Sequence, residues 1–503
     1  MCGTHKEYEV FQKSFIFWFN ISEEIYSSSK SEKLCIHFRN VIYSLVDCIC
    51  MHSRLQPDHV TVPPSKNDEF GEFRLKASDL IADVVFIVEA NKCFDKLYLT
   101  LQAPNTTWIE LEASLFLMCS FAKSIAYDEE QSVVQVVQSI LNLPETVHIA
   151  VRSTGIKLIG ELCEWLNKHP QFIDNALNFV CYGFANPKLC VAAANTMLNI
   201  CTQCQQHMVN HLETLFNIVL SGENVNMPGE ASIELLKGAV VILCNLPANE
   251  IATPLLKLAH VQLEGLQKAL QNTTKTKEPT LNPLFWLDRF TAIFRTIKIR
   301  NYSEGSGVHP CQPVIESVWP TLSICLNKYQ KDSKLTESCC RSLRFALRCT
   351  DKHSMTSLPD IVNTIITMYR VNHYSCFLYL GSILVDIYGT DDGMKTGLIE
   401  MMQVFTQEAF DHIVKHCVDV ENISELRKHP DTIDDFFRLS LRFIQRCPLE
   451  FIESAIFSPI MTLAVTSLNL DHRDANLSVT KFLSEFVAYS HKPQIKASHF
   501  LID

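Results

Sequence analysis

Apolar residues recur at intervals of three and four along most of the chain. The segment 147–166 shows the pattern, with apolar or small side chains at Val147, Ala150, Val151, Gly155, Leu158, Ile159, Leu162, Cys163 and Leu166. This spacing places them on one face of an α-helix. Pro144-Glu145 before the segment is typical of a helix start, and His169-Pro170 after it predicts the end.

The same pattern returns in neighbouring segments. We expect helices at 172–184, 189–204, 207–220 and 231–246, separated by Asn186-Pro187 and by polar loops. A helix, a short turn and a second helix thus repeat about every 40 residues, which matches HEAT and armadillo repeats. Alternating strand patterns are scarce and no Asn-Gly hairpin occurs, so we expect almost no β-structure.

The predicted fold is all-α, a HEAT/armadillo-like α-solenoid superhelix with a concave surface. Residues 1–503 would form a single solenoid of roughly eleven paired-helix repeats. The alternative is a set of separate helical domains, but no shift in composition supports it.

Composition narrows the function classes. With 47% hydrophobic residues, the chain is too apolar to be disordered. Its formal charge of −11 argues against direct binding of nucleic acid. Most of the 20 cysteines lie within apolar helical patterns, where cysteine acts as a small hydrophobic residue. The longest apolar run, 376–385, is too short to span a bilayer, and no signal peptide is recognisable. We therefore expect an intracellular protein that does not enter a membrane.

No enzymatic signature stands out. The chain contains no Walker A or Rossmann glycine motif, no H-E-x-x-H and no G-x-S-x-G. Cys201, Cys204, His207 and His211 have a spacing that suits zinc, but they follow a helical pattern and lack a second ligand pair. We expect no metal, no cofactor and no catalysis. A zinc site there, and a catalytic Cys–His pair formed in three dimensions, stay as alternatives.

The most informative charges are Arg341, Arg344 and Arg348, which we call the arginine row. Since each helical residue turns about 100°, the three lie within a stripe of about 60°. Leu343, Ala346 and Leu347 fall on the opposite face. Glu337 and Asp351 can neutralise the ends, whereas Arg344 has no local partner. Such a row suits an external phosphate or carboxylate, although most exposed charge rows have no function.

A secondary basic row consists of Arg438, Arg442 and Arg446, spaced four apart. Asp434 precedes Arg438 by four residues, the favourable order for a helical ion pair. We therefore expect this row to be partly neutralised within the chain and rank it below the first.

Several longer segments resemble the transportin-SR family of the importin-β superfamily, the receptors for SR splicing factors. They include Phe70–Arg74, Leu143–Val147, His309–Gln312, Ser338–Arg348, Ser375–Asp386, His429–Thr432 and Leu470–Asn476. The resemblance covers nearly the whole chain, which corresponds to a family sequence without its N-terminal and extreme C-terminal repeats.

The resemblance implies a nuclear import receptor with a cargo-binding part around residues 310–360. In the family, an arginine-rich inner helix binds phosphorylated Arg-Ser repeats, and that helix falls on Arg341, Arg344 and Arg348. Ser338 stands where the family pattern has a further arginine. The implied partners are phosphorylated SR-type cargo, the small GTPase Ran and nucleoporins, with shuttling between cytoplasm and nucleus through the nuclear pore. The alternative is a helical scaffold, or a truncated receptor that binds cargo without Ran-driven release.

Overall fold

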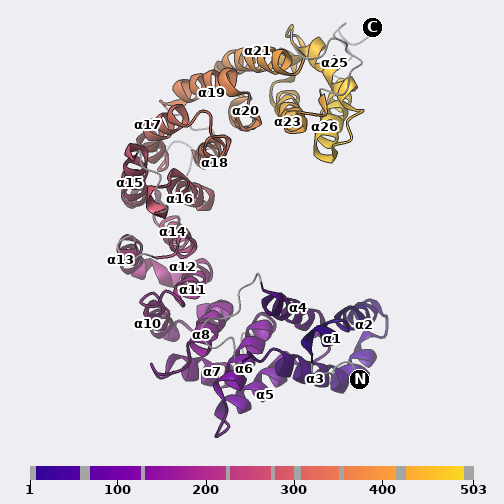
Figure 1. Ribbon diagram of the computed structural model, residues 1–503, viewed down its shortest axis with the longest axis vertical. Coiled ribbons are helices and arrows are strands. Elements are labelled where there is room, and N and C mark those ends of the chain that lie inside the picture. Colours follow the sequence, from indigo (N-terminus) through magenta and orange to yellow (C-terminus); the bar gives the residue numbers. More distant parts are fainter. Residues whose placement is uncertain are drawn as a thin grey trace. The chain divides into compact units, whose positions relative to one another are not determined.

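Helices stacked in pairs form the computed structural model of this chain (Figure 1). The structure describes residues 7–56, 68–125, 131–222, 227–272, 278–299, 308–350, 356–414 and 426–491. These residues contain no β-strand, as the periodicity predicts. They divide into two compact units, Met1–Asn245 and Leu246–Asp503, and each is described by itself.

The first unit contains an inner row of helices that pack one on the next. This row consists of α4 (Glu69–Val84), α6 (Trp108–Phe121), α8 (Ile149–Glu161), α11 (Cys190–Gln203) and α14 (Gly229–Leu243). Outside them lie α3 (Ser31–His52), α5 (Ala90–Gln102), α7 (Gln131–Leu141), α10 (Ile173–Gly183) and α13 (Leu212–Gly222). The remaining short elements are α1 (Tyr8–Gln12), α2 (Phe15–Ser27), η3 (Ala122–Ser124), α9 (Cys163–Lys168), η4 (Pro170–Phe172), α12 (Gln205–Met208) and η5 (Val209–His211).

The second unit repeats this arrangement. Its inner row is α16 (Pro283–Thr296), α18 (Ser333–Thr350), α20 (Ser375–Tyr388), α23 (Pro430–Arg446) and α26 (Arg473–Ser490), again packed in succession. The other elements are α15 (Ala248–Gln271), η6 (Pro279–Leu281), α17 (Gln312–Lys328), α19 (Leu358–Asn372), α21 (Asp392–Val414), α24 (Pro448–Ile452) and α25 (Phe457–Ser467). The two-row pattern confirms the predicted α-solenoid class, while the number of repeats stays a prediction.

The helix expected over 147–166 is divided in two. It begins at Ile149, where the His148 side chain accepts a hydrogen bond from the Ala150 amide. Pro144 therefore precedes the helix rather than opening it. Leu162, with φ −89° and ψ 13°, separates α8 from α9. The apolar spacing continues through this break, which explains why periodicity alone did not locate it.

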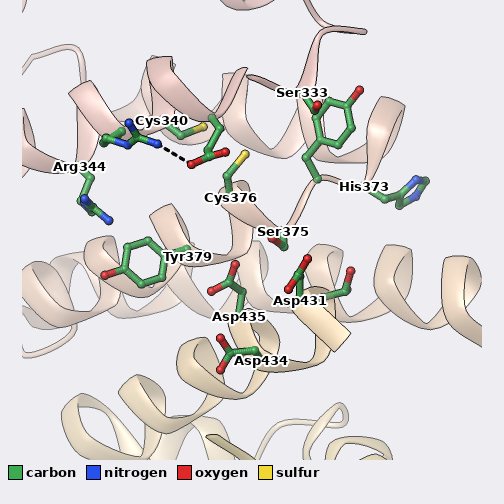
Figure 2. Close-up of a pocket in the computed structure, with 14 residues that line it drawn as sticks. Ser333, Cys340, Arg344, His373, Ser375, Cys376, Tyr379, Asp431, Asp434 and Asp435 are labelled. Atoms are coloured by element: carbon green, nitrogen blue, oxygen red, sulfur yellow. Dashed lines mark hydrogen bonds and ion pairs between the residues drawn. The ribbon is translucent and has the colours of Figure 1, made fainter. Parts of the chain in front are cut away.

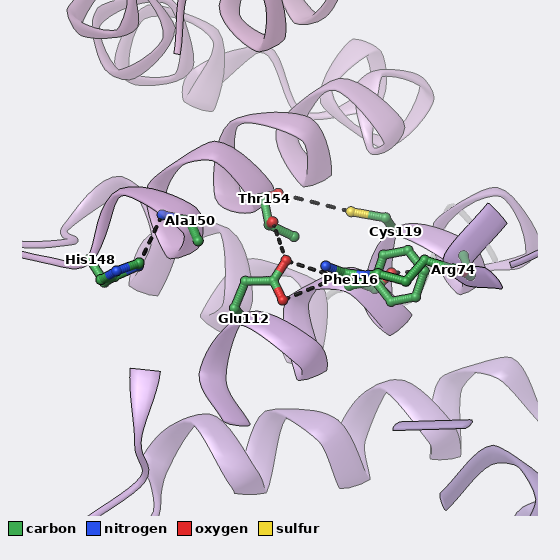
Figure 3. A network of polar contacts seen from close by, with 8 residues as sticks. Arg74, Glu112, Phe116, Cys119, His148, Ala150 and Thr154 are labelled. Atoms are coloured by element: carbon green, nitrogen blue, oxygen red, sulfur yellow. Dashed lines mark hydrogen bonds and ion pairs between the residues drawn. The ribbon is translucent and has the colours of Figure 1, made fainter. Parts of the chain in front are cut away.

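A buried polar contact joins three inner helices of the first unit (Figure 3). Both carboxylate oxygens of Glu112 on α6 accept from Arg74 on α4, at 2.9 and 3.1 Å. Thr154 on α8 donates to the same carboxylate at 2.7 Å. The guanidinium of Arg74 also lies 3.9 Å from the Phe116 ring centroid. Because every group in this buried contact has partners, it fixes the register of three successive repeats.

One helix, α3, is long and apolar enough to cross a membrane by length and composition. It packs against α2, α4 and α6. Its buried residues, Ile42, Leu45, Val46, Ile49 and His52, follow the spacing of an amphipathic helix with one packed face. That pattern is the one expected of a repeat helix in a solenoid.

Candidate functional site

The arginine row lies on α18, in the inner row of the second unit. Its apolar face, with Leu343, Ala346 and Leu347, is buried, and α18 packs on α16, α17 and α20. Arg341 and Arg348 are exposed and Arg344 is half-buried. The predicted division of this helix into an apolar and a cationic face is therefore confirmed. Binding by these arginines stays a prediction.

The three arginines have different surroundings. Arg341 forms an ion pair with Glu337 at 2.6 Å, as the spacing predicts. The guanidinium carbon of Arg344 lies 4.5 Å from the Phe345 ring centroid and 5.2 Å from that of Tyr379 on α20. Within the described part of the chain, neither Arg344 nor Arg348 makes an ion pair. Asp351, the expected partner of Arg348, lies outside the described residues.

Ser338 is not part of the cationic face. Its side chain is 3% exposed, and Ser342 donates to its backbone oxygen. Ser342 also donates to Leu287 on α16, so this side of α18 is packed against the preceding repeat. A serine fits here because its small side chain can be enclosed, while a long charged side chain would have to leave the interface.

A cavity of about 550 Å³ opens beside Arg341 and Arg344 (Figure 2). It is lined by α18, α20 and α23 and by the turn before α20. Arg344 lies on one side, and Asp431, Asp434 and Asp435 of α23 lie on the other. Arg341 also lines the cavity. The cavity therefore presents cationic and anionic groups to the same occupant.

Asp435 is an acidic group of this cavity whose pKa is strongly perturbed. Its burial raises the pKa of the carboxyl to about 7, against the effect of a hydrogen bond from Ser375. Arg438 is 3.9 Å away and only partly offsets this loss of hydration. Near neutral pH the protonation of Asp435, and with it the charge on the acidic side of the cavity, therefore responds to a charged group bound beside it.

The second basic row is partly neutralised by ion pairs, as the sequence predicts. Arg438 pairs with Asp434 at 3.0 Å, the contact that the sequence spacing predicts. Arg446 and Arg442 share Asp386 of α20, at 2.7 and 3.9 Å. The sequence did not reveal Asp386 as a partner because it lies on another helix, 60 residues from Arg446.

The geometry supports neither the zinc site nor the catalytic Cys–His pair that the sequence left as alternatives. The described residues contain no group of three or more His, Cys, Asp or Glu side chains able to hold a metal. Cys204 donates to the Cys163 carbonyl, and His211 pairs with Asp174. Cys311 does lie beside His309, and hydrogen bonds from Cys349 and His309 lower the pKa of its thiol. Its side chain is 0% exposed, so a substrate has no access to the sulfur.

Comparison with known protein families relates segments of this chain to transportin-3 and importin-13. Three family models match: the Transportin-3/Importin-13 second TPR domain at residues 1–52, the third at 130–218 and the fourth at 309–413. The last match contains the whole arginine row. Over these three segments the chain is similar to transportin-3 and importin-13.

Individual relatives agree with this assignment. Transportin MOS14 of Arabidopsis thaliana is 25% identical over 96% of this chain and 51% of its own length. The mRNA transport regulator MTR10 of Saccharomyces cerevisiae is 22% identical over 97% of this chain, and human importin-13 is 22% identical over 87%. This chain spans about half the length of the curated proteins it matches.

Solved structures show the same fold. Importin-13 in its cytosolic state superposes with a TM-score of 0.77, at 19% identity over 96% of this chain and 56% of the other. Kap95p, solved with RanGDP, gives a TM-score of 0.59 at 14% identity over 95% of this chain and 56% of the other. The HEAT-type solenoid fold of this chain is therefore established.

The structure adds two residues to the site that sequence reasoning missed. Arg295 of α16 is exposed, and its guanidinium carbon lies 5.7 Å from the Phe345 ring centroid. Phe345 is thus approached by arginines from two neighbouring helices, Arg295 and Arg344. Tyr379 of α20 is the other addition. Arg295 and Tyr379 lie on the inner helices before and after α18. Helical periodicity does not predict which residues of neighbouring repeats come together, so the sequence did not reveal them.

Proposed function

We propose that this chain is the cargo-binding part of a nuclear import receptor for proteins rich in phosphorylated Arg-Ser repeats, such as SR splicing factors. The observation that carries the proposal is Arg344, a guanidinium without an ion pair among the described residues, at the edge of a large inner-row cavity. Similarity to transportin and importin-13 supports the class of function. The relatives are transport receptors, and we propose no enzymatic role.

The chemistry of phosphoserine suits the arginine row. A phosphoserine carries about −1.5 to −2 charges at neutral pH and three acceptor oxygens. Arginine offers a planar fork that binds phosphate through two parallel hydrogen bonds. Phe345 and Tyr379 limit the positions of the Arg344 side chain before cargo arrives. Less conformational entropy is then lost on binding.

The acidic side of the cavity suits the other half of an Arg-Ser repeat. Asp431 and Asp435 lie across the cavity from Arg344, and arginines of the cargo alternate with its phosphoserines. A bound cargo guanidinium beside Asp435 would favour the ionised carboxylate and so offset the burial that raises its pKa. A purely basic site would attract any polyanion, whereas this cavity favours a chain of alternating charge.

We extend the proposal to transport. The receptor would shuttle between cytoplasm and nucleus, contact nucleoporins and release its cargo to Ran-GTP. The fold of Kap95p, which was solved with RanGDP, supports the Ran step. Adding Ran-GTP to a preformed cargo complex tests it, because cargo release is expected of a receptor and continued binding of a scaffold.

The central test is a titration with a fluorescent Arg-Ser peptide, phosphorylated or not, followed by anisotropy. We expect the phosphorylated peptide to bind more tightly, and Arg344→Glu to abolish the difference. Arg442→Glu is the charge-matched control, since Arg442 already lies near Asp386, at 3.9 Å. Equal affinity for both peptides, or the same loss in both variants, contradicts the proposal.

A further inference from the structure

Helix α18 contacts both neighbouring helices through cysteine pairs. Cys339 is hydrogen-bonded to Cys325 of α17, and the adjacent Cys340 is hydrogen-bonded to Cys376 of α20. All four are free thiols. Consecutive residues of one helix thus reach sulfur atoms on two different helices.

The two pairs differ in their access to solvent. Cys325 is 0% and Cys339 1% exposed, so that pair is enclosed between α17 and α18. Cys340 is 4% exposed, but Cys376 is only half-buried, and both line the cavity beside Arg341 (Figure 2). A small oxidant that enters the cavity reaches Cys376 first.

We propose that Cys340 and Cys376 form a reversible oxidation site, at which a peroxide converts the two thiols into a disulfide between α18 and α20. The proposal does not depend on what the cavity binds. It rests on the contact between the two sulfurs, on their place in the cavity wall and on the exposure of Cys376.

The chemistry needs hydrogen peroxide and no other reagent. The Cys376 sulfur, as thiolate, attacks one peroxide oxygen, the O–O bond breaks, and hydroxide leaves to take up a proton as water. The resulting sulfenic acid lies against Cys340. The Cys340 sulfur then attacks the Cys376 sulfur, and the S–O bond of the sulfenic acid breaks. The hydroxyl group takes the Cys340 proton and leaves as a second water. Two thiols are oxidised and one peroxide is reduced to two waters.

The difference in exposure assigns a separate role to each sulfur. The hydrogen bond to Cys376 raises the pKa of Cys340, together with burial, and so keeps the proton on that residue. Cys376 is the more exposed of the two residues and is therefore the first to meet a peroxide in the cavity. Cys376 is therefore the attacked sulfur and Cys340 the resolving one. Reduction by a small thiol would restore both.

The linkage would fix two helices that line the cavity. Ser375 precedes Cys376 and donates to Asp435, and Tyr379 lies one turn further along α20. On α18, Arg341 follows Cys340. A disulfide would therefore prevent α18 and α20 from separating at the cavity and slow local opening there.

The test treats the folded full chain with hydrogen peroxide and maps thiols by mass spectrometry without reduction. We expect a peptide that joins Cys340 to Cys376 and lacks two hydrogen atoms, with Cys325 and Cys339 still reduced. In Cys340→Ser, the same treatment should leave a Cys376 sulfenic acid that dimedone captures. Cys376→Ser should give no linked peptide. Hydrogen exchange in α18 and α20 should slow after oxidation and recover with dithiothreitol.

Two results would overturn the proposal. One is a Cys376 that stays reduced while other half-buried cysteines, such as Cys35 and Cys48, are oxidised. The other is oxidation of the enclosed Cys325–Cys339 pair to the same extent, which would show unfolding rather than a site. Circular dichroism of each variant before treatment verifies that the fold is kept.

Discussion

The guanidinium carbon of Arg344 lies 5.2 Å from the ring centroid of Tyr379, on the next inner helix. This contact joins a cation of α18 to an aromatic ring of α20 at the edge of the cavity. It orients the arginine without neutralising its charge, because an aromatic face attracts a cation but supplies no anion. Arg446, by comparison, already forms an ion pair with Asp386 at 2.7 Å.

Replacing Tyr379 by alanine should weaken binding of a phosphorylated Arg-Ser peptide. The loss should be about 0.5–1 kcal/mol, the size of a partly exposed cation–π contact. Tyr379→Phe keeps the ring and should bind nearly as the parent does. Peptide titration by calorimetry measures both. If the two variants lose the same amount, the Tyr379 hydroxyl rather than its ring matters, and our account of Arg344 is wrong.

Removing Glu112 should destabilise the first unit strongly. Glu112→Ala leaves Arg74, whose side chain is 9% exposed, buried beside Phe116 without a counter-charge. Breaking a buried pair in this way costs about 3–5 kcal/mol. Urea denaturation followed by circular dichroism measures the free energy of unfolding. The exposed pair Lys96–Asp47 is the control, since Asp47→Ala should cost less than about 1 kcal/mol.

The double variant Arg74→Met with Glu112→Leu separates charge from packing. Because it removes both buried charges, its free energy of unfolding should lie closer to the parent than that of Glu112→Ala. A loss equal to the sum of the single variants would mean that the two residues do not interact, contrary to the hydrogen bonds at 2.9 and 3.1 Å.

Asp435 should make the stability of the second unit depend on pH. Burial raises the pKa of this carboxyl to about 7 in the folded chain, against an ordinary value of 3.8. Between these values the folded state holds a proton that the unfolded state has released. The contribution of Asp435 to stability is therefore greatest below about pH 4 and is lost as the pH rises toward 7.

Asp435→Asn should remove this dependence, because the amide does not titrate. Denaturation of the parent protein and of the variant at a series of pH values between about 5 and 8 gives the difference in their free energies of unfolding. This difference should shift in favour of the variant as the pH rises and level off above the raised pKa. A difference that is constant across the range would contradict the raised pKa. Addition of a phosphorylated Arg-Ser peptide should reduce the difference near neutral pH if a cargo arginine lies beside Asp435.

Two glycines in outer helices should respond oppositely to alanine. A Cβ at Gly265 of α15 would overlap the Trp286 ring, so Gly265→Ala must displace a large side chain and should destabilise the chain. At Gly397 of α21 nothing lies within 4 Å of such a Cβ. Gly397→Ala should stabilise by about 0.5–1 kcal/mol, because alanine loses less backbone entropy in a helix. Thermal unfolding of the two variants distinguishes close packing from helix propensity.

Helical periodicity was sufficient to predict the fold class and most helices of the segments considered. The reason is that apolar residues must face a neighbouring helix at a spacing of three and four, whatever that neighbour is. The segments expected at 172–184 and 189–204 appear as Ile173–Gly183 and Cys190–Gln203. The break at Leu162 was missed, since the apolar face continues across it.

The arginine row was also determined by the sequence, because three arginines within one helix share a face by geometry alone. Their surroundings were decided only by the tertiary structure. Tyr379, Arg295 and the carboxylates of α23 reach the site from other repeats. Asp386 pairs with Arg446 of the second row from 60 residues away. Periodicity fixes which way a side chain faces on its own helix. Which helices meet, and at what register, depends on how side chains pack between repeats, and only the folded chain contains that information.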